Sequence, residues 1–265
     1  MVKQAPPEPG AIERQDRKQR RRSTRRKAEV YGLVATLMIV AGVLAACSSA
    51  GNDAQPGGSG PIPTPVPTST ATPIPTSGAL EPGTYSFSTF VPDFDASHRI
   101  TMSVPDGYEG GGGYVALKLD RTSQTGVSVW AVGDVYADPC DRVGSLLDPP
   151  AGSSVDGLVA ALASQQGLRV STPISVTVDG FPATYMERTV PAGTDIAGCH
   201  GGEFRVWLAT DGGARYLDPG QQDLLWILDV DGVPLVIDAA LEAGISAQDR
   251  AEIIRIAESV RIDPR

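Results

Sequence analysis

The chain of 265 residues has few of the residues on which enzyme sites depend: it holds only two histidines and three cysteines, and 6% of it is aromatic. The Gly-x-Ser-x-Gly signature of many hydrolases is absent, as is the Asp-x-Asp-x-Asp-Gly spacing of calcium loops. No Lys-Ser/Thr pair follows the glycine-rich stretch 109–117, which excludes a phosphate-binding loop of that kind. We therefore predict no catalytic residues, no metal site and no cofactor, and the sequence favours a non-enzymatic protein without deciding the question.

Positive charge is scarce outside the first 30 residues. Those residues hold ten of the 22 Lys and Arg but only four of the 31 Asp and Glu, so the net charge of -9 becomes -15 for the remainder. An acidic body has no basic patch with which to neutralise phosphates, which excludes nucleic acid as a partner. The basic head is typical of the cytoplasmic flank of an exported segment.

An uncharged apolar run extends over residues 30–46 and ends at Cys47. It has 17 residues, whereas a membrane-spanning helix needs about 20, so its length suits the core of a signal peptide better. The residues Leu44-Ala45-Ala46-Cys47 resemble the lipobox of bacterial lipoprotein signal peptides. This resemblance implies cleavage before Cys47 and a lipid on its sulfur, and hence a protein anchored to the cell membrane and facing outside the cytoplasm. The alternative is a single-pass anchor that is not cleaved at Cys47, and the long basic leader favours this reading.

Composition divides the chain into three parts. Residues 1–46 form the leader and apolar segment, residues 47–80 form a Pro/Thr/Ser/Gly-rich spacer, and residues 81–265 form a single globular domain. Alternating prolines between Pro61 and Pro67 favour polyproline II in the spacer. We expect the spacer to hold the domain away from the membrane.

The domain is predicted to be α+β, with a mainly antiparallel sheet and two helices packed on it. Helices are expected at 153–167 and 246–260, where Ser153 and Ser246 are in capping positions ahead of apolar stripes. Asp179-Gly180 and Asp231-Gly232 each separate two apolar strand patterns and predict two-residue hairpins, which pair strands antiparallel. The further strands are expected where apolar residues alternate at period two, at 85–90, 99–104, 114–119, 127–132 and 203–209.

Several segments resemble those of uncharacterised lipoproteins of high-GC Gram-positive bacteria, namely "VPDGY", "VYADPC", "VTVDGFPATYMERTVP", "GEFRVW" and "LLWILDVDGVPLVIDA". The order of elements is similar to PsbP-like α+β domains. The resemblance implies a PsbP-like α+β fold and a location outside the cytoplasm, and it implies no catalytic activity.

Cys140 and Cys199 remain if Cys47 is lipidated, and in an exported protein such a pair predicts a disulfide. A zinc site with His200 is the alternative, although adjacent Cys and His residues do not easily share one tetrahedral ion.

Two functions from different classes stay open. The first is a non-catalytic domain that binds a protein, a glycan or a small molecule outside the cell. The second is a cell-envelope hydrolase, which would need a deep pocket with a titratable Asp or Glu near His98, Trp130 or Trp226. Asp229 and Asp231 match the first motif of one phosphatase class, but too little chain follows them to build the required sheet, and we expect a hairpin there instead.

Overall fold

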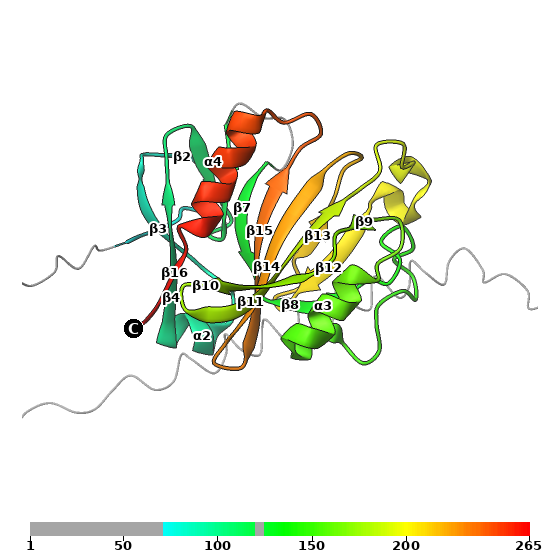
Figure 1. Ribbon diagram of the computed structural model, residues 1–265, viewed down its shortest axis with the longest axis horizontal. Helices are drawn as coiled ribbons and strands as arrows, with labels where there is room; N and C mark the ends of the chain where they lie inside the picture. Colours follow the sequence, from blue (N-terminus) through cyan, green and yellow to red (C-terminus); the bar gives the residue numbers. More distant parts are fainter. Residues whose placement is uncertain (1–70, 120–124) are drawn as a thin grey trace, which may run out of the picture. The chain divides into compact units, whose positions relative to one another are not determined.

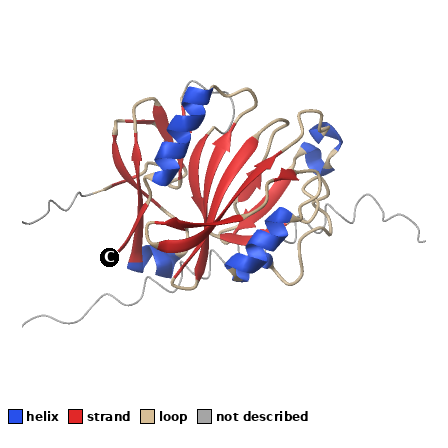
Figure 2. Cartoon of the chain, viewed as in Figure 1, coloured by secondary structure: helices blue, strands red, loops and turns tan. Residues whose placement is uncertain are grey.

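Antiparallel β-structure dominates the part of the chain that the computed structural model describes, residues 71–119 and 125–265 (Figures 1 and 2). Cys47 and the apolar run before it lie outside the described residues, as does most of the predicted spacer. Among the helices of the described part, none has both the length and the apolar character that crossing a membrane requires.

A nine-stranded sheet forms the centre of the fold. In spatial order its strands are β10 (Ile174–Val178), β11 (Phe181–Thr189), β14 (Gln222–Val230), β15 (Val233–Leu241), β7 (Gly126–Trp130), β6 (Val115–Lys118), β5 (Tyr108–Gly111) and β2 (Ala79–Leu80), and β9 (Arg169–Val170) also pairs with β11. The turns Asp179-Gly180 and Asp231-Gly232 have positive φ at all four residues and join β10 to β11 and β14 to β15. Both predicted hairpins are confirmed.

Each face of this sheet is covered by a smaller sheet and a helix. The four-stranded sheet has the order β1 (Thr72–Pro73), β3 (Gly83–Phe87), β4 (His98–Val104), β16 (Arg261–Pro264), and the three-stranded sheet has the order β13 (Ala214–Tyr216), β12 (Arg205–Ala209), β8 (Val132–Val135). Along β14, Leu224, Trp226 and Leu228 face the four-stranded sheet, whereas Leu225 and Ile227 face the three-stranded one. The strand period of two therefore divides the apolar residues into two cores, one on each face.

Helices α4 (Ala247–Glu258) and α3 (Val155–Ala163) pack into different cores (Figure 1). Ile253 and Ile256 of α4 join the core beneath the four-stranded sheet, and Leu158 and Leu162 of α3 join the other core. Shorter helices are α2 (Pro92–Ser97), η2 (Ala151–Ser153), η3 (Ile196–Gly198) and η4 (His200–Gly202). The predicted α+β class is confirmed, with α2 as an element that the sequence did not indicate.

The helix caps follow the predicted chemistry with one shift in position. Ser246 Oγ accepts a hydrogen bond from Asp249 N at 3.1 Å, as the capping pattern predicts. In α3 the capping residue is Ser154, which accepts from Gly157 N, and not Ser153, which belongs to the preceding 3-10 turn. A serine pair before an apolar stripe offers two candidate caps, and only the backbone path selects one of them.

The fold begins before the predicted boundary at Glu81. β1 pairs in parallel with β3, β2 pairs with β5, and the side chains of Ile74 and Leu80 are buried in the core beneath the four-stranded sheet. Gly110 makes this path possible, because a Cβ on Gly110 would lie 2.7 Å from atoms of Pro75. The last residues of the predicted spacer 47–80 thus belong to the domain, although their composition resembles that of the spacer.

Candidate functional site

A cavity of about 310 Å³ lies between the nine-stranded sheet and β13 of the three-stranded sheet. We call it the inter-sheet cavity. Its described lining residues are Tyr114, Val115, Leu117, Gly126, Ser128, Trp130, Ala214, Arg215, Tyr216 and Ala240. The volume is within the range of small-molecule sites, at its lower end.

Small side chains on neighbouring strands leave this space empty. Ala240 of β15 stands opposite Gly126 of β7, and Ser128 is two residues further along β7 on the same face. Gly126 has a reason of its own to be glycine, because a Cβ there would lie 2.1 Å from the carbonyl oxygen of Ala116 on β6. The close approach of β6 and β7 therefore also removes a side chain from the cavity floor.

Two aromatic rings wall the cavity. Tyr114 and Trp130 meet edge to face, with ring centroids 4.9 Å apart. The ring centroid of Trp207 lies 5.8 Å from that of Trp130, and the ring centroid of Phe90 lies 5.4 Å from that of Tyr114, so each wall residue also packs against a second aromatic ring. Trp130 Nε1 donates to Ser128 Oγ at 2.7 Å, so the indole ring presents its apolar surface to the space.

A cluster of four buried charged side chains begins at the cavity wall: Arg188, Arg215, Asp223 and Asp238, which we call the charge cluster. Arg215 Nε donates to Asp238 Oδ2 at 2.7 Å, and its Nη2 donates to Asp223 Oδ1 at 2.9 Å. Arg188 Nη2 donates to Asp223 Oδ2 at 2.8 Å, so Asp223 bridges both guanidinium groups. Only Arg215 of the four lines the cavity.

Neutral groups complete the cluster. Arg188 Nη1 donates to Gln165 Oε1 at 2.6 Å, while Gln165 Nε2 donates to the carbonyl oxygens of Tyr136 and Val206. The guanidinium of Arg188 also lies over the ring of Trp207, 4.9 Å from its centroid. The cluster therefore ties α3's C-terminal segment to β11 and β12.

The two carboxylates are not equivalent. Asp223 accepts from both arginines and from Gln221 Nε2, whereas Asp238 Oδ1 has no hydrogen-bond partner although its residue is fully buried. Burial raises the pKa of Asp238 to about 6, against the opposing influence of Arg215. The cluster is neutral when both aspartates are ionised and carries one positive charge when Asp238 is protonated.

Tyr114 and Arg215 of the cavity wall keep the charge states that are usual for these residues near pH 7. Burial raises the pKa of Tyr114, with a further contribution from Asp211, so its hydroxyl stays neutral near pH 7. Burial acts to lower the pKa of Arg215, but Asp223 and Asp238 outweigh it and the net shift is upward. Arg215 is thus a permanent positive charge at the wall.

A second series of ion pairs links the cavity to the disulfide. Tyr216 receives a hydrogen bond from Arg205 Nη2 at 2.7 Å, and the same nitrogen lies 3.1 Å from Glu203 Oε2. Glu203 also pairs with Arg142, two residues after Cys140. The loops that hold the cysteines therefore contact the residues that support one cavity wall.

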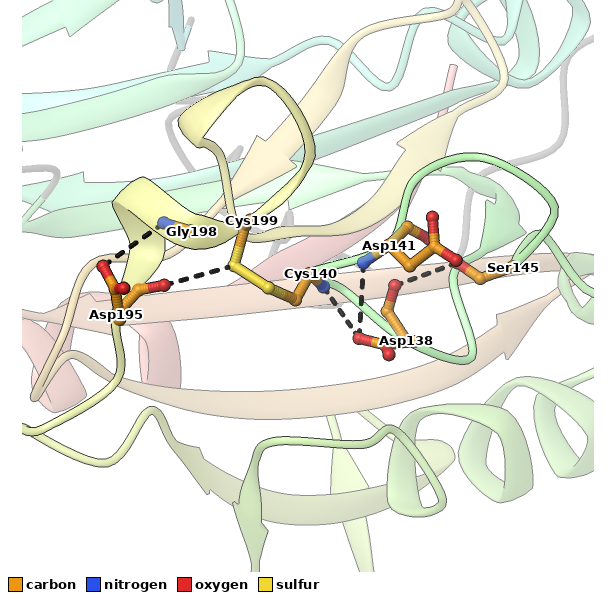
Figure 3. The surroundings of a disulfide bond; sticks show 7 residues. All are labelled: Asp138, Cys140, Asp141, Ser145, Asp195, Gly198 and Cys199. Carbon is orange, nitrogen blue, oxygen red and sulfur yellow. Dashed lines mark hydrogen bonds between the residues drawn. A yellow bond between two sulfur atoms is a disulfide. The ribbon is translucent and has the colours of Figure 1, made fainter. Parts of the chain in front are cut away.

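Cys140 and Cys199 have the geometry of a disulfide, with sulfur atoms 2.03 Å apart across a sequence separation of 59 (Figure 3). Asp138 Oδ1 accepts from Cys140 N, and Asp195 Oδ1 accepts from Gly198 N beside Cys199. These aspartates order both loops. The predicted pairing of Cys140 with Cys199 agrees with the structure, because their sulfur atoms are bonded. Within residues 71–119 and 125–265, no three His, Cys, Asp or Glu side chains are grouped so that they could hold a metal ion.

The two motifs that resemble enzyme signatures have structural roles. Asp229 Oδ1 accepts from Gly232 N within the β14–β15 turn, and Asp231 Oδ2 lies 3.0 Å from His98 Nε2. The glycine-rich stretch 109–117 lies in β5, a turn and β6. His98 is largely buried, and its ring stacks on Phe94 with the ring centroids 4.7 Å apart.

All three tryptophans are buried, and Trp130 also lines the cavity. The charge cluster was not predicted. One signal was available, because Asp238 interrupts an apolar strand pattern at a position that alternation directs inward. Its partners come from β11, β13 and β14, and no sequence spacing brings them together.

Strand order and core arrangement define the class of this protein as an α+β domain built on a mainly antiparallel sheet. No family model and no curated protein matches the chain. Among solved structures, the solution structure of cyanobacterial PsbP (CyanoP) from Synechocystis sp. PCC 6803 is similar to it, with 13% sequence identity and a TM-score of 0.33. That likeness covers 70% of this chain and 96% of the other.

Proposed function

We propose that this protein is a lipid-anchored binding protein that faces outside the cytoplasm and holds a small ligand in the inter-sheet cavity. The observation that carries the binding function is the cavity itself, walled by Tyr114 and Trp130 and bordered by the charge of Arg215. A space of this size with aromatic walls and few polar groups is the usual form of a small-molecule site.

The location rests on the sequence. The lipobox-like Leu44–Cys47 supports a lipid on Cys47, and the paired cysteines suit an oxidising compartment. Intact mass of the protein extracted from membranes tests this part. A chain that begins at Cys47 with added acyl mass supports the lipoprotein, whereas an intact Met1 would leave the uncleaved membrane anchor.

Hydrolysis is not part of the proposal. The described residues that line the inter-sheet cavity include no histidine and no carboxylate, and Asp238 is hydrogen-bonded to Arg215, which itself lines the cavity. A general base must reach its proton directly or through one water, and Asp238 is not among the described residues that line the cavity.

The binding function is tested with the full-length chain and a library of small aromatic and aliphatic fragments. Because Trp130 lines the cavity, its fluorescence and its indole NMR resonance report on occupancy. Ala214→Leu on β13 reduces the space, and Ala79→Leu at an exposed site on β2 is the matched control. Fragments should bind the wild type and the control and lose affinity for Ala214→Leu. The proposal fails if no fragment shifts the Trp130 signals, or if Ala214→Leu binds as well as the control.

A further inference from the structure

The charges at the inter-sheet cavity are arranged with a direction. Asp223 and Asp238 are fully buried and do not line the cavity, whereas Arg215, which pairs with both, does. A ligand in the cavity therefore meets the positive end of the cluster first. This orientation favours a negative group in the cavity and disfavours a cation.

The floor of the cavity adds a hydrogen-bond donor. Ser128 Oγ accepts from Trp130 Nε1, and its own hydrogen has no acceptor among the described residues. A hydroxyl in this state can donate to an anionic oxygen. The aromatic walls Tyr114 and Trp130, together with Val115 and Leu117, suit an apolar body attached to that group.

Directly across the strand pair from Ser128 is Asp238, on the same face of the sheet. One of its oxygens accepts from Arg215, and the other, Oδ1, is a buried acceptor without a partner. A buried oxygen without a hydrogen-bond partner destabilises the ionised form of Asp238. A proton on this oxygen converts the carboxylate to a neutral carboxylic acid, which is a hydrogen-bond donor. An anion placed in the cavity increases this cost further by repulsion.

We propose that the inter-sheet cavity binds a small organic anion, a carboxylate or sulfonate on an aromatic or aliphatic body, and that binding is coupled to uptake of one proton by Asp238. This inference rests on the proposed function, since it names the ligand class of the same cavity. The charged groups around Asp238 are Arg215 on β13, Asp223 on β14 and Arg188 on β11. Beyond them, Tyr114, before β6, acts on the pKa of Arg215, and Asp211 acts on the pKa of Tyr114. The carboxyl of Asp238, with its pKa of about 6, changes its charge between roughly pH 5 and pH 7.5.

The coupling has a definite sign and an upper limit. If the anion binds only to the form with a protonated Asp238, affinity rises as the pH falls. Because the carboxyl titrates at about pH 6, its protonated fraction grows about thirty-fold between roughly pH 7.5 and pH 5. The gain in affinity is therefore at most about thirty-fold.

Benzenesulfonate and benzenesulfonamide are suitable probes, because the sulfonate keeps its charge and the sulfonamide stays neutral over this range. Titration calorimetry of the full-length chain in two buffers of different ionisation enthalpy measures both affinity and proton uptake. We expect the sulfonate to bind more tightly than the sulfonamide and to gain affinity towards pH 5, with proton uptake at pH 7.5. The affinity of the sulfonamide should not change with pH.

Asp238→Asn should remove the pH dependence of sulfonate binding and the proton uptake, while Ala214→Leu should weaken both probes. If Asp238→Asn does not fold, the inference is still tested by comparing the binding of the two probes to the wild type. Equal binding of both probes, or a sulfonate affinity that is independent of pH, overturns the inference and leaves the proposed function standing. If neither probe binds, the inference is overturned too, and the fragment library alone then tests the proposed function.

Discussion

Replacing Asp223 and Asp238 one at a time by asparagine is a direct test of the charge cluster. Both residues are fully buried, and both substitutions keep the shape of the side chain while removing its charge. Asp223 holds two guanidinium groups and Gln221, whereas Asp238 holds one guanidinium and leaves an oxygen without a partner. The structure therefore predicts unequal losses of stability.

The magnitudes follow from these contacts. Asp223→Asn leaves Arg188 and Arg215 buried with a single carboxylate, and breaking a buried pair in this way costs about 3–5 kcal/mol. Burial raises the pKa of Asp238 from its ordinary value of 3.8 to about 6, which corresponds to an unfavourable contribution of about 3 kcal/mol at neutral pH. Asp238→Asn removes that cost together with the bond to Arg215, so we expect a change within about 1 kcal/mol.

The raised pKa of Asp238 also sets the direction of the pH effect. Its contribution to stability is complete below about pH 4 and is lost as the pH rises through about 6, because the folded state binds the proton more tightly than the unfolded one. Asparagine cannot titrate. Relative to the wild type, Asp238→Asn should therefore lose about 2 kcal/mol when the pH is lowered from roughly 7.5 to 4.

Urea unfolding of the full-length chain, followed by tryptophan fluorescence and circular dichroism at several pH values, measures these differences. Equal losses for the two variants at about pH 7.5 would refute the assigned roles of the two carboxylates. So would a difference between the wild type and Asp238→Asn that stays constant down to about pH 4.

Three further predictions concern the disulfide, the domain boundary and a hairpin. The double variant Cys140→Ser/Cys199→Ser should lose about 4 kcal/mol of unfolding free energy, because the bond closes a loop with a sequence separation of 59, and a reductant should then have no further effect in urea unfolding. Leu80→Ala should lower the unfolding free energy by about 2–4 kcal/mol because the side chain is buried, whereas Leu119→Ala, at an exposed site, should lower it by less than about 1 kcal/mol. Equal losses for the two variants would contradict a domain that includes Leu80. Gly232→Ala should lower the unfolding free energy by about 1–2 kcal/mol through backbone strain alone, since the φ of Gly232 is +84° and a Cβ there meets no atom within 4 Å. An unchanged midpoint of thermal unfolding would argue against the positive-φ turn.

Local patterns account for the elements that were predicted. Asp-Gly pairs between apolar runs defined two hairpins, and a serine before an apolar stripe defined α4, because turn and cap chemistry depends on residues within one turn of each other. The start of the domain was misplaced for the opposite reason. Thr72–Leu80 has the composition of a spacer, and its strands form only because β3 and β5 offer free edges to it.

The sequence by itself determined the α+β class and the antiparallel pairing, since periodicity and turn residues are local properties. It predicted the pairing of Cys140 with Cys199 only on the condition that Cys47 carries a lipid, and the structure brings the two sulfur atoms together. Only the tertiary structure decided that there is an inter-sheet cavity and that Arg188, Arg215, Asp223 and Asp238 meet beside it. These residues come from four strands of two sheets, and their contact depends on strand order and register. The empty space depends on which small side chains become neighbours across strands, which no stretch of sequence specifies alone.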